Sequence, residues 1–223
     1  MASRAIIGLG NPGARYAGTR HNAGFLVVER LAARHGLAWQ KSANGSALVA
    51  DGVVAGVPLR LVEPLTFMNR SGEVLDGIAA AEGLSPGDLL VVHDEVDLPF
   101  GRLKLKQGGG NAGHRGLRSI QEHLGGDAGF ARLRVGVGRP PAGMDTADWV
   151  LADFDPAEAP RLEALLESGA DGCEAWLSLD LVAAVNRVNA RDPAAAGGPP
   201  VGSRGSDGSD GPAGPGGTPS GEP

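Results

Sequence analysis

The chemically capable polar side chains of this chain gather in three short segments that lie far apart in the sequence: 8–25, 64–72 and 91–101. These segments contain one well-placed histidine (His21), two asparagine amides (Asn11 and Asn69) and a carboxylate (Asp94), but no convincing nucleophile. An imidazole can activate a water molecule, and amides can hold the oxyanion that forms on an attacked carbonyl. The inventory therefore favours a hydrolase in which water attacks the substrate directly.

His21 and Asp94 are the expected catalytic pair. His21 follows a glycine-containing loop and precedes a predicted helix, and loops on a rigid scaffold are where chemistry tends to lie. Asp94 follows an apolar strand predicted over 89–93, at the carboxyl end, where sites open in α/β sheets. A hydrogen bond between the two would fix the tautomer of the imidazole and stabilise the imidazolium. The alternatives are a surface histidine and an exposed loop acid, which is what we expect of Glu95 and Asp97.

Asn11 and Asn69 can orient water and peptide or hold an oxyanion without carrying a charge, and Asn11 joins His21 and Asp94 as the third expected catalytic residue. Their structural alternatives are turn formation for Asn11 and helix capping for Asn69. Beside Asn69, Phe67 and Met68 could line a peptide groove, although an apolar pair before a helix is more often part of the core.

The net charge of −6 argues against a nucleic-acid partner, but the charges are unevenly distributed. Residues 100–140 hold eight basic and two acidic side chains, whereas residues 141–191 hold three basic and ten acidic ones. A basic band on an acidic protein indicates a local phosphate-binding surface, with a solvated charged face as the alternative. The basic residues of the band are Arg102, Lys104, Lys106, Arg115, Arg118, Arg132, Arg134 and Arg139.

A glycine run over 107–116 leads from this band into a predicted helix. Glycine-rich backbone at a helix amino terminus offers N–H groups to a phosphate, and Lys104, Lys106, Arg115 and Arg118 flank it. The alternative is a mobile loop. We include these four cations among the candidate substrate-binding residues.

Three motifs are weaker than they look. The GLGNPG stretch at 8–13 fits a dinucleotide fingerprint, but no helix follows at once and the expected second-strand acid is missing. The GLSPG stretch at 83–87 fits a nucleophile elbow, yet it joins a helix to a strand, in the wrong order. The acids after His93 alternate in direction along an extended chain, so a metal site there is less favoured than one working carboxylate.

The elements that must position these residues alternate between strand and helix, which predicts an α/β fold: a single domain with a twisted mixed β-sheet flanked by helices. The predicted strands are 4–9, 46–51, 53–54, 59–63, 89–93, 102–106 and 132–137. Helices are predicted over 23–35, 71–82, 114–124 and 180–189, with one more beginning at the capping box of Asp155.

We expect a catalytic domain over 1–190 and a disordered tail rich in Gly, Pro and Ser over 191–223, because the tail lacks apolar anchors. No membrane span or signal segment is expected, and the single cysteine, Cys173, suits a reducing cytoplasm.

The three segments, and their order, resemble the bacterial-type peptidyl-tRNA hydrolase family, over about residues 4–189. The resemblance implies cleavage of the ester that joins a peptide to the 3′-terminal ribose of tRNA, by a cytoplasmic, usually monomeric enzyme without metal or organic cofactor. It places the catalytic histidine on His21, its partner on Asp94 and the substrate-site amides on Asn11 and Asn69. Tyr16 and His114 join the candidate substrate-binding residues.

Arg115 departs from the family pattern, which usually has asparagine there. The cation could hold a tRNA phosphate, shift substrate preference or slow turnover. Two other functions compete with the hydrolase: a non-catalytic RNA-binding relative on the same fold, and a metal-dependent phosphoesterase that uses His93, Asp94 and Asp97.

Overall fold

One mixed sheet organises the computed structural model. The structure describes residues 4–76 and 83–190, and within these ranges seven strands pair in the order β2-β3-β4-β1-β5-β7-β6. The four central strands, β4, β1, β5 and β7, are parallel, and the outer strands join them antiparallel. The strands are β1 (Arg4–Gly8), β2 (Gln40–Lys41), β3 (Ala47–Val54), β4 (Val57–Pro64), β5 (Leu89–Glu95), β6 (Leu103–Gln107) and β7 (Ala131–Gly136).

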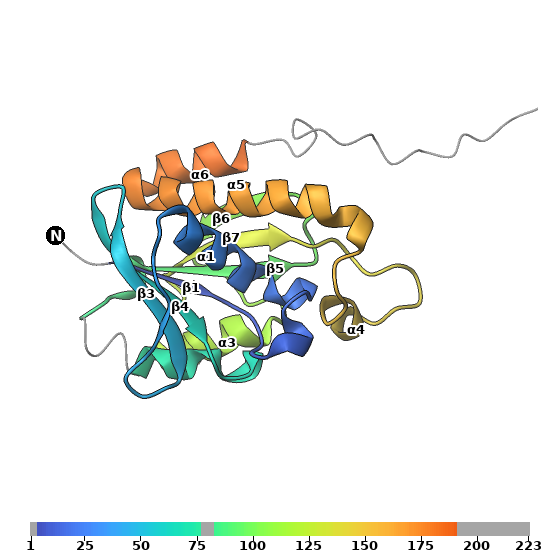
Figure 1. The fold of residues 1–223 in the computed structure, drawn as a ribbon, viewed down its shortest axis with the longest axis horizontal. Coiled ribbons are helices and arrows are strands. Elements are labelled where there is room, and N and C mark those ends of the chain that lie inside the picture. The colour runs from blue at the N-terminus through green and yellow to red at the C-terminus, as the bar shows by residue number, and fades with distance from the viewer. Residues whose placement is uncertain (1–3, 77–82, 191–223) are drawn as a thin grey trace, which may run out of the picture.

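Helices cover both faces of the sheet. Helices α1 (Ala23–Arg34), α5 (Ala159–Ser178) and α6 (Leu181–Asn189) lie on one face, and α3 (Arg115–His123) lies on the other (Figure 1). The short α4 (Thr146–Val150) lies at one end of the molecule (Figure 1). Short 3-10 turns complete the description: η1 (Ala14–Tyr16), η2 (Arg20–Asn22), η3 (Met68–Val74), η4 (Pro86–Asp88) and η5 (Pro156–Glu158).

The sheet separates two apolar cores. Ile6, Leu90 and Leu133 face α1 and α5, whereas Ile7 and Val91 face α3 and η3. Strands buried on both faces need continuous apolar runs, which is why β5 begins Leu-Leu-Val-Val. Within the described residues, no helix combines the length and apolarity that a bilayer crossing requires.

One glycine sets how closely α1 approaches the sheet. A Cβ on Gly24 would collide with the carbonyl oxygen of Val92 and with the backbone of Leu9. The absence of a side chain at this position lets the first turn of α1 rest directly on β1 and β5. The loop that carries His21 is thereby held against the ends of these two strands.

The predicted fold class is confirmed, and most predicted elements form within one or two residues of their expected ends. The strand predicted over 59–63 begins two residues earlier, at Val57, because the hairpin turns tightly at Ala55-Gly56, both at positive φ. The helix expected over 71–82 begins instead as η3 at Met68, and residues 77–82 lie outside the described residues. The sequence did not predict β2 or α4. The tail over 191–223 also lies outside the described residues.

Candidate active site

A cavity of 590 Å³ opens where β1, β4 and β5 end. Because parallel strands of one sheet end at the same edge, the three segments singled out from the sequence meet there. A further wall comes from α4 and the residue after it. The lining residues are Asn11, His21, Phe67, Met68, Asn69, Asp94, Glu95, Val96, Asn111, Ala112, Gly113, His114, Arg115, Thr146, Ala147, Val150 and Leu151.

His21 and Asp94 are in hydrogen-bond contact at this cavity. The Nδ1 of His21 lies 2.9 Å from Oδ1 of Asp94. The side chain of Asp94 is 3% exposed and that of His21 is 15% exposed, so only the histidine keeps contact with solvent. Because a carboxylate accepts hydrogen bonds, Nδ1 carries the proton and Nε2 is left as the basic nitrogen.

The electrostatics of the pair follow from burial and charge. Burial opposes protonation of His21, but the charge and hydrogen bond of Asp94 outweigh it, and the pKa of His21 is raised above its ordinary value; Arg115 acts in the opposite direction. Burial would raise the pKa of Asp94, but His21 and His114 hold it far below its usual range. Asp94 is therefore a permanent anion that stabilises a proton on the imidazole.

His114 is a second ring on the same carboxylate. Its Nε2 lies 3.0 Å from Asp94 Oδ1, and its Nδ1 accepts a long hydrogen bond of 3.3 Å from the backbone N–H of Leu117 at the start of α3. The cap fixes the tautomer, since an accepting Nδ1 leaves the proton on Nε2 to face Asp94. His114, expected among the substrate-binding residues, lines the cavity and contacts Asp94, the start of α3 and the rings of His21 and His93.

His93 is a buried histidine that contacts both His114 and Asp94. Its ring packs edge-on against His114, with centroids 5.0 Å apart, and Nδ1 donates to the backbone carbonyl of Asp94 at 2.7 Å. Complete burial lowers the pKa of His93 to about 3, so the ring stays neutral. Sequence reasoning gave His93 only a metal-binding alternative and missed this packing role.

Asn11 is held by its amide oxygen. Its Oδ1 accepts from the backbone N–H of Met68 at 2.9 Å, so the Nδ2 end is the one left to the cavity. Asn22 brackets the backbone of Asn11: its Oδ1 accepts from the Asn11 N–H at 2.8 Å and its Nδ2 donates to the Asn11 carbonyl at 3.0 Å. The sequence gave no role to Asn22, which follows His21 directly and could have been noticed for that reason.

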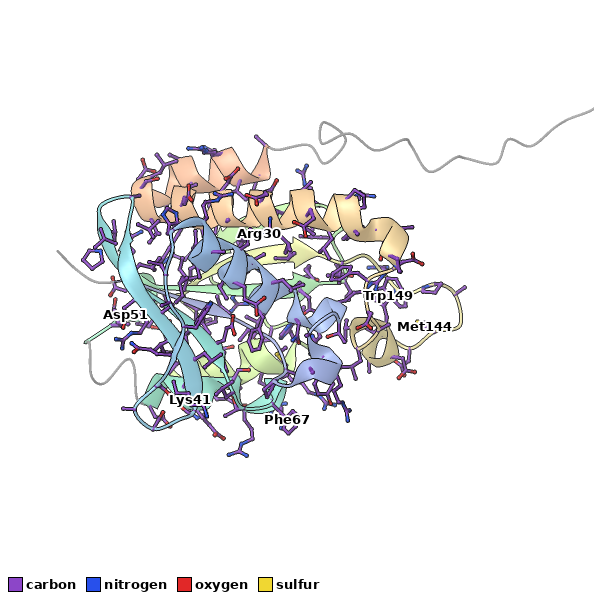
Figure 2. The ribbon with its side chains drawn as sticks, viewed as in Figure 1. Arg30, Lys41, Asp51, Phe67, Met144 and Trp149 are labelled. Atoms are coloured by element: carbon purple, nitrogen blue, oxygen red, sulfur yellow. The ribbon has the colours of Figure 1, made fainter. Side chains whose placement is uncertain are left out.

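The rim of the cavity is partly apolar. Phe67 is 56% exposed, and the nearby Asn69 is exposed as well, while Met68 is buried beneath them. The expectation that Phe67 and Met68 form an apolar core pair therefore holds for Met68 alone. Figure 2 shows Phe67 and Met144 projecting from separate segments of the surface.

Comparisons with known proteins identify the family of the chain. The family model of peptidyl-tRNA hydrolase matches residues 5–196. The chain belongs to the peptidyl-tRNA hydrolase family. A peptidyl-tRNA hydrolase of Frankia alni is 48% identical, with 83% of this chain and 93% of the relative covered. One of Rhodococcus opacus is 45% identical, with 82% and 96% covered. The crystal structure of peptidyl-tRNA hydrolase from Acinetobacter baumannii superposes with a TM-score of 0.79 at 34% identity, covering 86% and 96%.

In this member of the family, the predicted basic band is weaker than the sequence count suggests. Arg134 pairs with Glu95 and Arg139 with Asp97, both at 2.8 Å or less. Arg132 is buried. The expectation that Glu95 is an exposed loop acid was wrong, because Glu95 is 7% exposed and paired. Asp97 is exposed as expected.

The cations proposed to bind tRNA differ in availability. Lys104 is exposed, and Lys106 Nζ lies over the glycine loop, since a Cβ on Gly109 would be 2.6 Å from it. Arg115 is exposed at the cavity, and no hydrogen bond or ion pair engages it among the described residues. Arg118 pairs with Glu122 at 2.9 Å on the surface of α3.

Tyr16 does not line the cavity. It lies in η1, where the guanidinium of Arg15 stacks over its ring at 4.4 Å. The candidate residues therefore divide into a group that the fold brings to the cavity and a peripheral group on other surfaces. The peripheral group consists of Tyr16, Lys104, Lys106 and Arg118.

The cluster with metal-ligand chemistry in the described residues is not the one that the phosphoesterase hypothesis used. His21, Asp94 and His114 place ligand-capable atoms within 4.8 Å of one another. A single oxygen of Asp94 already serves both rings, so hydrogen bonds account for this arrangement. His93 is turned to the Asp94 backbone and Asp97 is paired with Arg139, so the three residues of that hypothesis do not converge.

Proposed function

We propose that this chain hydrolyses the ester between the peptide and the 3′-terminal ribose of peptidyl-tRNA, with His21 as the base that activates water. One observation carries the proposal: the Nδ1 of His21 is held 2.9 Å from the buried Asp94 while the ring lines a cavity of 590 Å³. That arrangement presents the basic Nε2 to a substrate and orients it in advance.

In the first step, Nε2 of His21 takes a proton from a water molecule as the water oxygen attacks the ester carbonyl carbon. Asp94 does not take up the proton; it stabilises the imidazolium electrostatically. The carbonyl oxygen becomes an oxyanion. Asn11 is the favoured donor to this oxyanion, because its Oδ1 is engaged by Met68 and its Nδ2 faces the cavity.

In the second step, the bond between the carbonyl carbon and the ribose oxygen breaks, and the imidazolium of His21 protonates the departing oxygen. The products are a peptide carboxylic acid, which releases its proton to solvent as the carboxylate, and a tRNA with a free 3′-hydroxyl. A positioned base contributes ~10²–10⁴-fold to such a reaction. Asn69 and the exposed ring of Phe67 lie at the rim, where they can hold the peptide or the terminal base.

The tRNA would extend from the cavity toward the glycine loop and β6. Lys104 and Lys106 are two residues apart on this edge strand, so both face the side of the sheet that carries α3. The loop over 108–113 follows directly. Arg115 lines the cavity at the start of α3. Arg118 is a weaker candidate than the lysines, because its partner Glu122 must be displaced or share the charge.

The proposal further takes the enzyme to act as a monomer and without a metal or organic cofactor. We place the enzyme in the cytoplasm, where it would recycle tRNA from stalled or aborted translation. The domain over 1–190 would carry the activity, and we assign no catalytic role to the tail over 191–223.

The test is release of N-acetyl amino acid from N-acetyl-aminoacyl-tRNA, with and without EDTA. Wild type and His35→Ala should cleave the ester equally well, because His35 is an exposed histidine that pairs with Glu174 on α5. His21→Ala should lose at least ~10²-fold in kcat. EDTA should change none of these rates.

Two results would redirect the proposal. Loss of activity in EDTA, restored by a divalent metal, would favour a metal-dependent reaction at His21, Asp94 and His114. A folded wild type that binds tRNA and does not cleave it would favour the non-catalytic RNA-binding function, with Arg115 as the first residue to replace.

A further inference from the structure

We propose that Arg20 is a positioning residue that fastens the α4 wall of the cavity to the segment carrying His21, and so determines how tightly the substrate is held. This inference rests on the proposed function for its kinetic consequence. The fastening itself is a matter of contacts and can be tested without activity.

Arg20 is a buried cation held between aromatic rings. It is 3% exposed, and its guanidinium lies 3.8 Å from the ring centroid of Trp149 and 4.9 Å from that of Phe154. Stacking of this kind is strongest where water is excluded. The neighbouring side chain, His21, points to Asp94 instead, so consecutive residues of η2 serve the wall and the catalytic pair.

Hydrogen bonds fix the same guanidinium to the segment after α4. Nη1 donates to the backbone carbonyl of Asp153, and Nη2 donates to Glu158 Oε2 at 2.6 Å. Glu158 in turn accepts from the backbone N–H of Asp155, which closes the capping box at η5. The planar fork of arginine suits this double attachment, which a single ammonium could not reproduce.

The backbones of the two segments are joined as well. The Arg20 N–H donates to the Ala152 carbonyl at 3.0 Å, and the Phe154 N–H donates to the Gly18 carbonyl at 3.1 Å. The side chain of Arg20 therefore strengthens the contact between residues 18–20, next to His21, and residues 152–154.

Helix α4 buries little of its own surface. Helix α4 has five residues, of which Val150 alone is buried, and helices this short do not persist without tertiary contacts. Yet Thr146, Ala147 and Val150 line the cavity, together with Leu151 just beyond. Trp149, a residue of α4 that is labelled in Figure 2, is the residue through which Arg20 acts on this wall.

Stability alone does not explain a buried cation at this place. Its Nε has no hydrogen-bond partner among the described residues, and burying an incompletely satisfied charge is costly. The contacts do fix the orientation of the guanidinium, because two aromatic rings, a backbone carbonyl and a carboxylate surround it. Such an arrangement orders a wall that would otherwise be mobile.

The kinetic test compares Arg20→Met, Arg20→Lys and wild type. Arg20→Met should raise KM for N-acetyl-aminoacyl-tRNA by ~10-fold or more with kcat changed less than ~3-fold, because a wall contact acts on substrate and transition state alike. Arg20→Lys keeps a cation on Trp149 and should raise KM by an intermediate factor. The acid limb of the pH profile should stay at its wild-type position, since the pKa of His21 is shifted by burial, Asp94 and Arg115 and not by Arg20.

The opposite side of the contact offers a second route if Arg20→Met folds poorly. Trp149→Leu removes the ring face and the 2.8 Å hydrogen bond from Nε1 to the Gly138 carbonyl, so it should also raise KM, and the double variant should be no worse than Trp149→Leu alone. Arg30→Met is the matched control. Arg30 is also an arginine whose guanidinium pairs with acids of α5, but it lies on the exposed face of α1, away from the cavity (Figure 2).

A structural readout separates the two proposals. Labelling with 5-fluorotryptophan gives a 19F signal for Trp149, assigned from Trp149→Phe, beside those of Trp39 and Trp176. In Arg20→Met the Trp149 signal should shift or broaden while the other two stay in place. An unchanged Trp149 signal, or folded Arg20 variants with wild-type KM, would overturn the role of Arg20. A changed signal in a protein that does not cleave peptidyl-tRNA would leave the attachment standing and reject the function.

Discussion

His114 Nε2 lies 3.0 Å from Oδ1 of Asp94, the same oxygen that His21 Nδ1 approaches at 2.9 Å. The buried carboxylate is therefore held from two sides, and His114 is itself fixed by the amino terminus of α3. A carboxylate that cannot rotate presents a fixed partner to the imidazole of His21. Pre-organisation of this kind removes the cost of arranging the base when the substrate binds.

Replacing Asp94 should alter both the rate and its pH dependence. Asp94→Asn removes the charge that raises the pKa of His21, so burial dominates and the pKa falls. The acid limb of kcat/KM should move to lower pH, and kcat should fall by ~10²-fold or more as the tautomer is lost. Profiles from pH 5 to 9 measure both effects. Asp97→Asn, at an exposed acid paired with Arg139, is the control and should keep the wild-type profile; an unmoved acid limb in Asp94→Asn would contradict the pairing.

His114 should affect rate and stability separately. Asparagine is a good helix N-cap, so His114→Asn keeps the cap of α3 and loses the bond to Asp94. His114→Ala loses both, and it should cost a further ~1 kcal/mol of unfolding free energy. We expect the two variants to share a similar loss in kcat of about 10-fold, the order expected for one supporting hydrogen bond of ~1.5 kcal/mol. Denaturant unfolding measures the stabilities of the two variants, and single-turnover experiments measure their rates. Equal stabilities with unequal rates would contradict the two separate roles of His114.

The contact between His21 and Asp94 was predictable because it follows from topology. Buried parallel strands need apolar runs, so the end of β5 could be read from the sequence, and Asp94 with it. His21 lies before a helix that glycine lets approach the same strand ends. Side chains that end neighbouring strands meet, whatever their distance along the chain.

The rest of the site depends on partners that the sequence does not pair. Arg20 is buried because Trp149 and Phe154, more than a hundred residues later, cover it. Helix α4 is too short for a periodic apolar pattern, and β2 consists of two exposed residues. Charge counting also failed at Arg134, because its neutralisation by Glu95 is a tertiary contact.

Arg115 should influence the base through its charge. It lowers the pKa of His21, so Arg115→Asn should let that pKa rise further. The acid limb of the pH profile would then move to higher pH, and activity at pH 6 would fall relative to activity at pH 8. Arg115→Lys retains the charge and should keep the wild-type limb. A limb that moves to lower pH in Arg115→Asn would contradict this electrostatic role.

The lysines of β6 should carry a measurable share of the salt dependence of tRNA binding. If Lys104 and Lys106 each contact a phosphate, Lys104→Gln and Lys106→Gln should each reduce the slope of log affinity against log salt by ~0.7–0.9. Titrations of deacylated tRNA over a range of salt concentrations give that slope. Lys41 on β2, at the opposite edge of the sheet (Figure 2), supplies the control: Lys41→Gln should leave the slope unchanged. If all three variants keep the wild-type slope, the tRNA phosphates do not contact the lysines of β6.

Glu63 should make the protein less stable as pH rises toward 8. Its side chain is buried on β4, its Oε1 has no partner among the described residues, and burial, with a smaller contribution from Glu29, raises its pKa to about 8. Between its ordinary pKa of ~4.3 and 8, the folded state binds a proton that the unfolded state lacks, so the free energy of unfolding falls as pH rises through this window.

Glu63→Gln removes this proton linkage while keeping the shape of the side chain. The melting temperature of Glu63→Gln should exceed that of wild type by several degrees (~4 °C for each kcal/mol) at pH 8.5, and the difference should shrink toward pH 4.5. Glu73→Gln is the matched control, because Glu73 is only partly buried, paired with Arg70, and has a lowered pKa. Glu73→Gln should therefore not stabilise the protein at any pH. If the difference in melting temperature between Glu63→Gln and wild type does not change with pH, the pKa of Glu63 is not raised in the folded protein and this prediction is wrong.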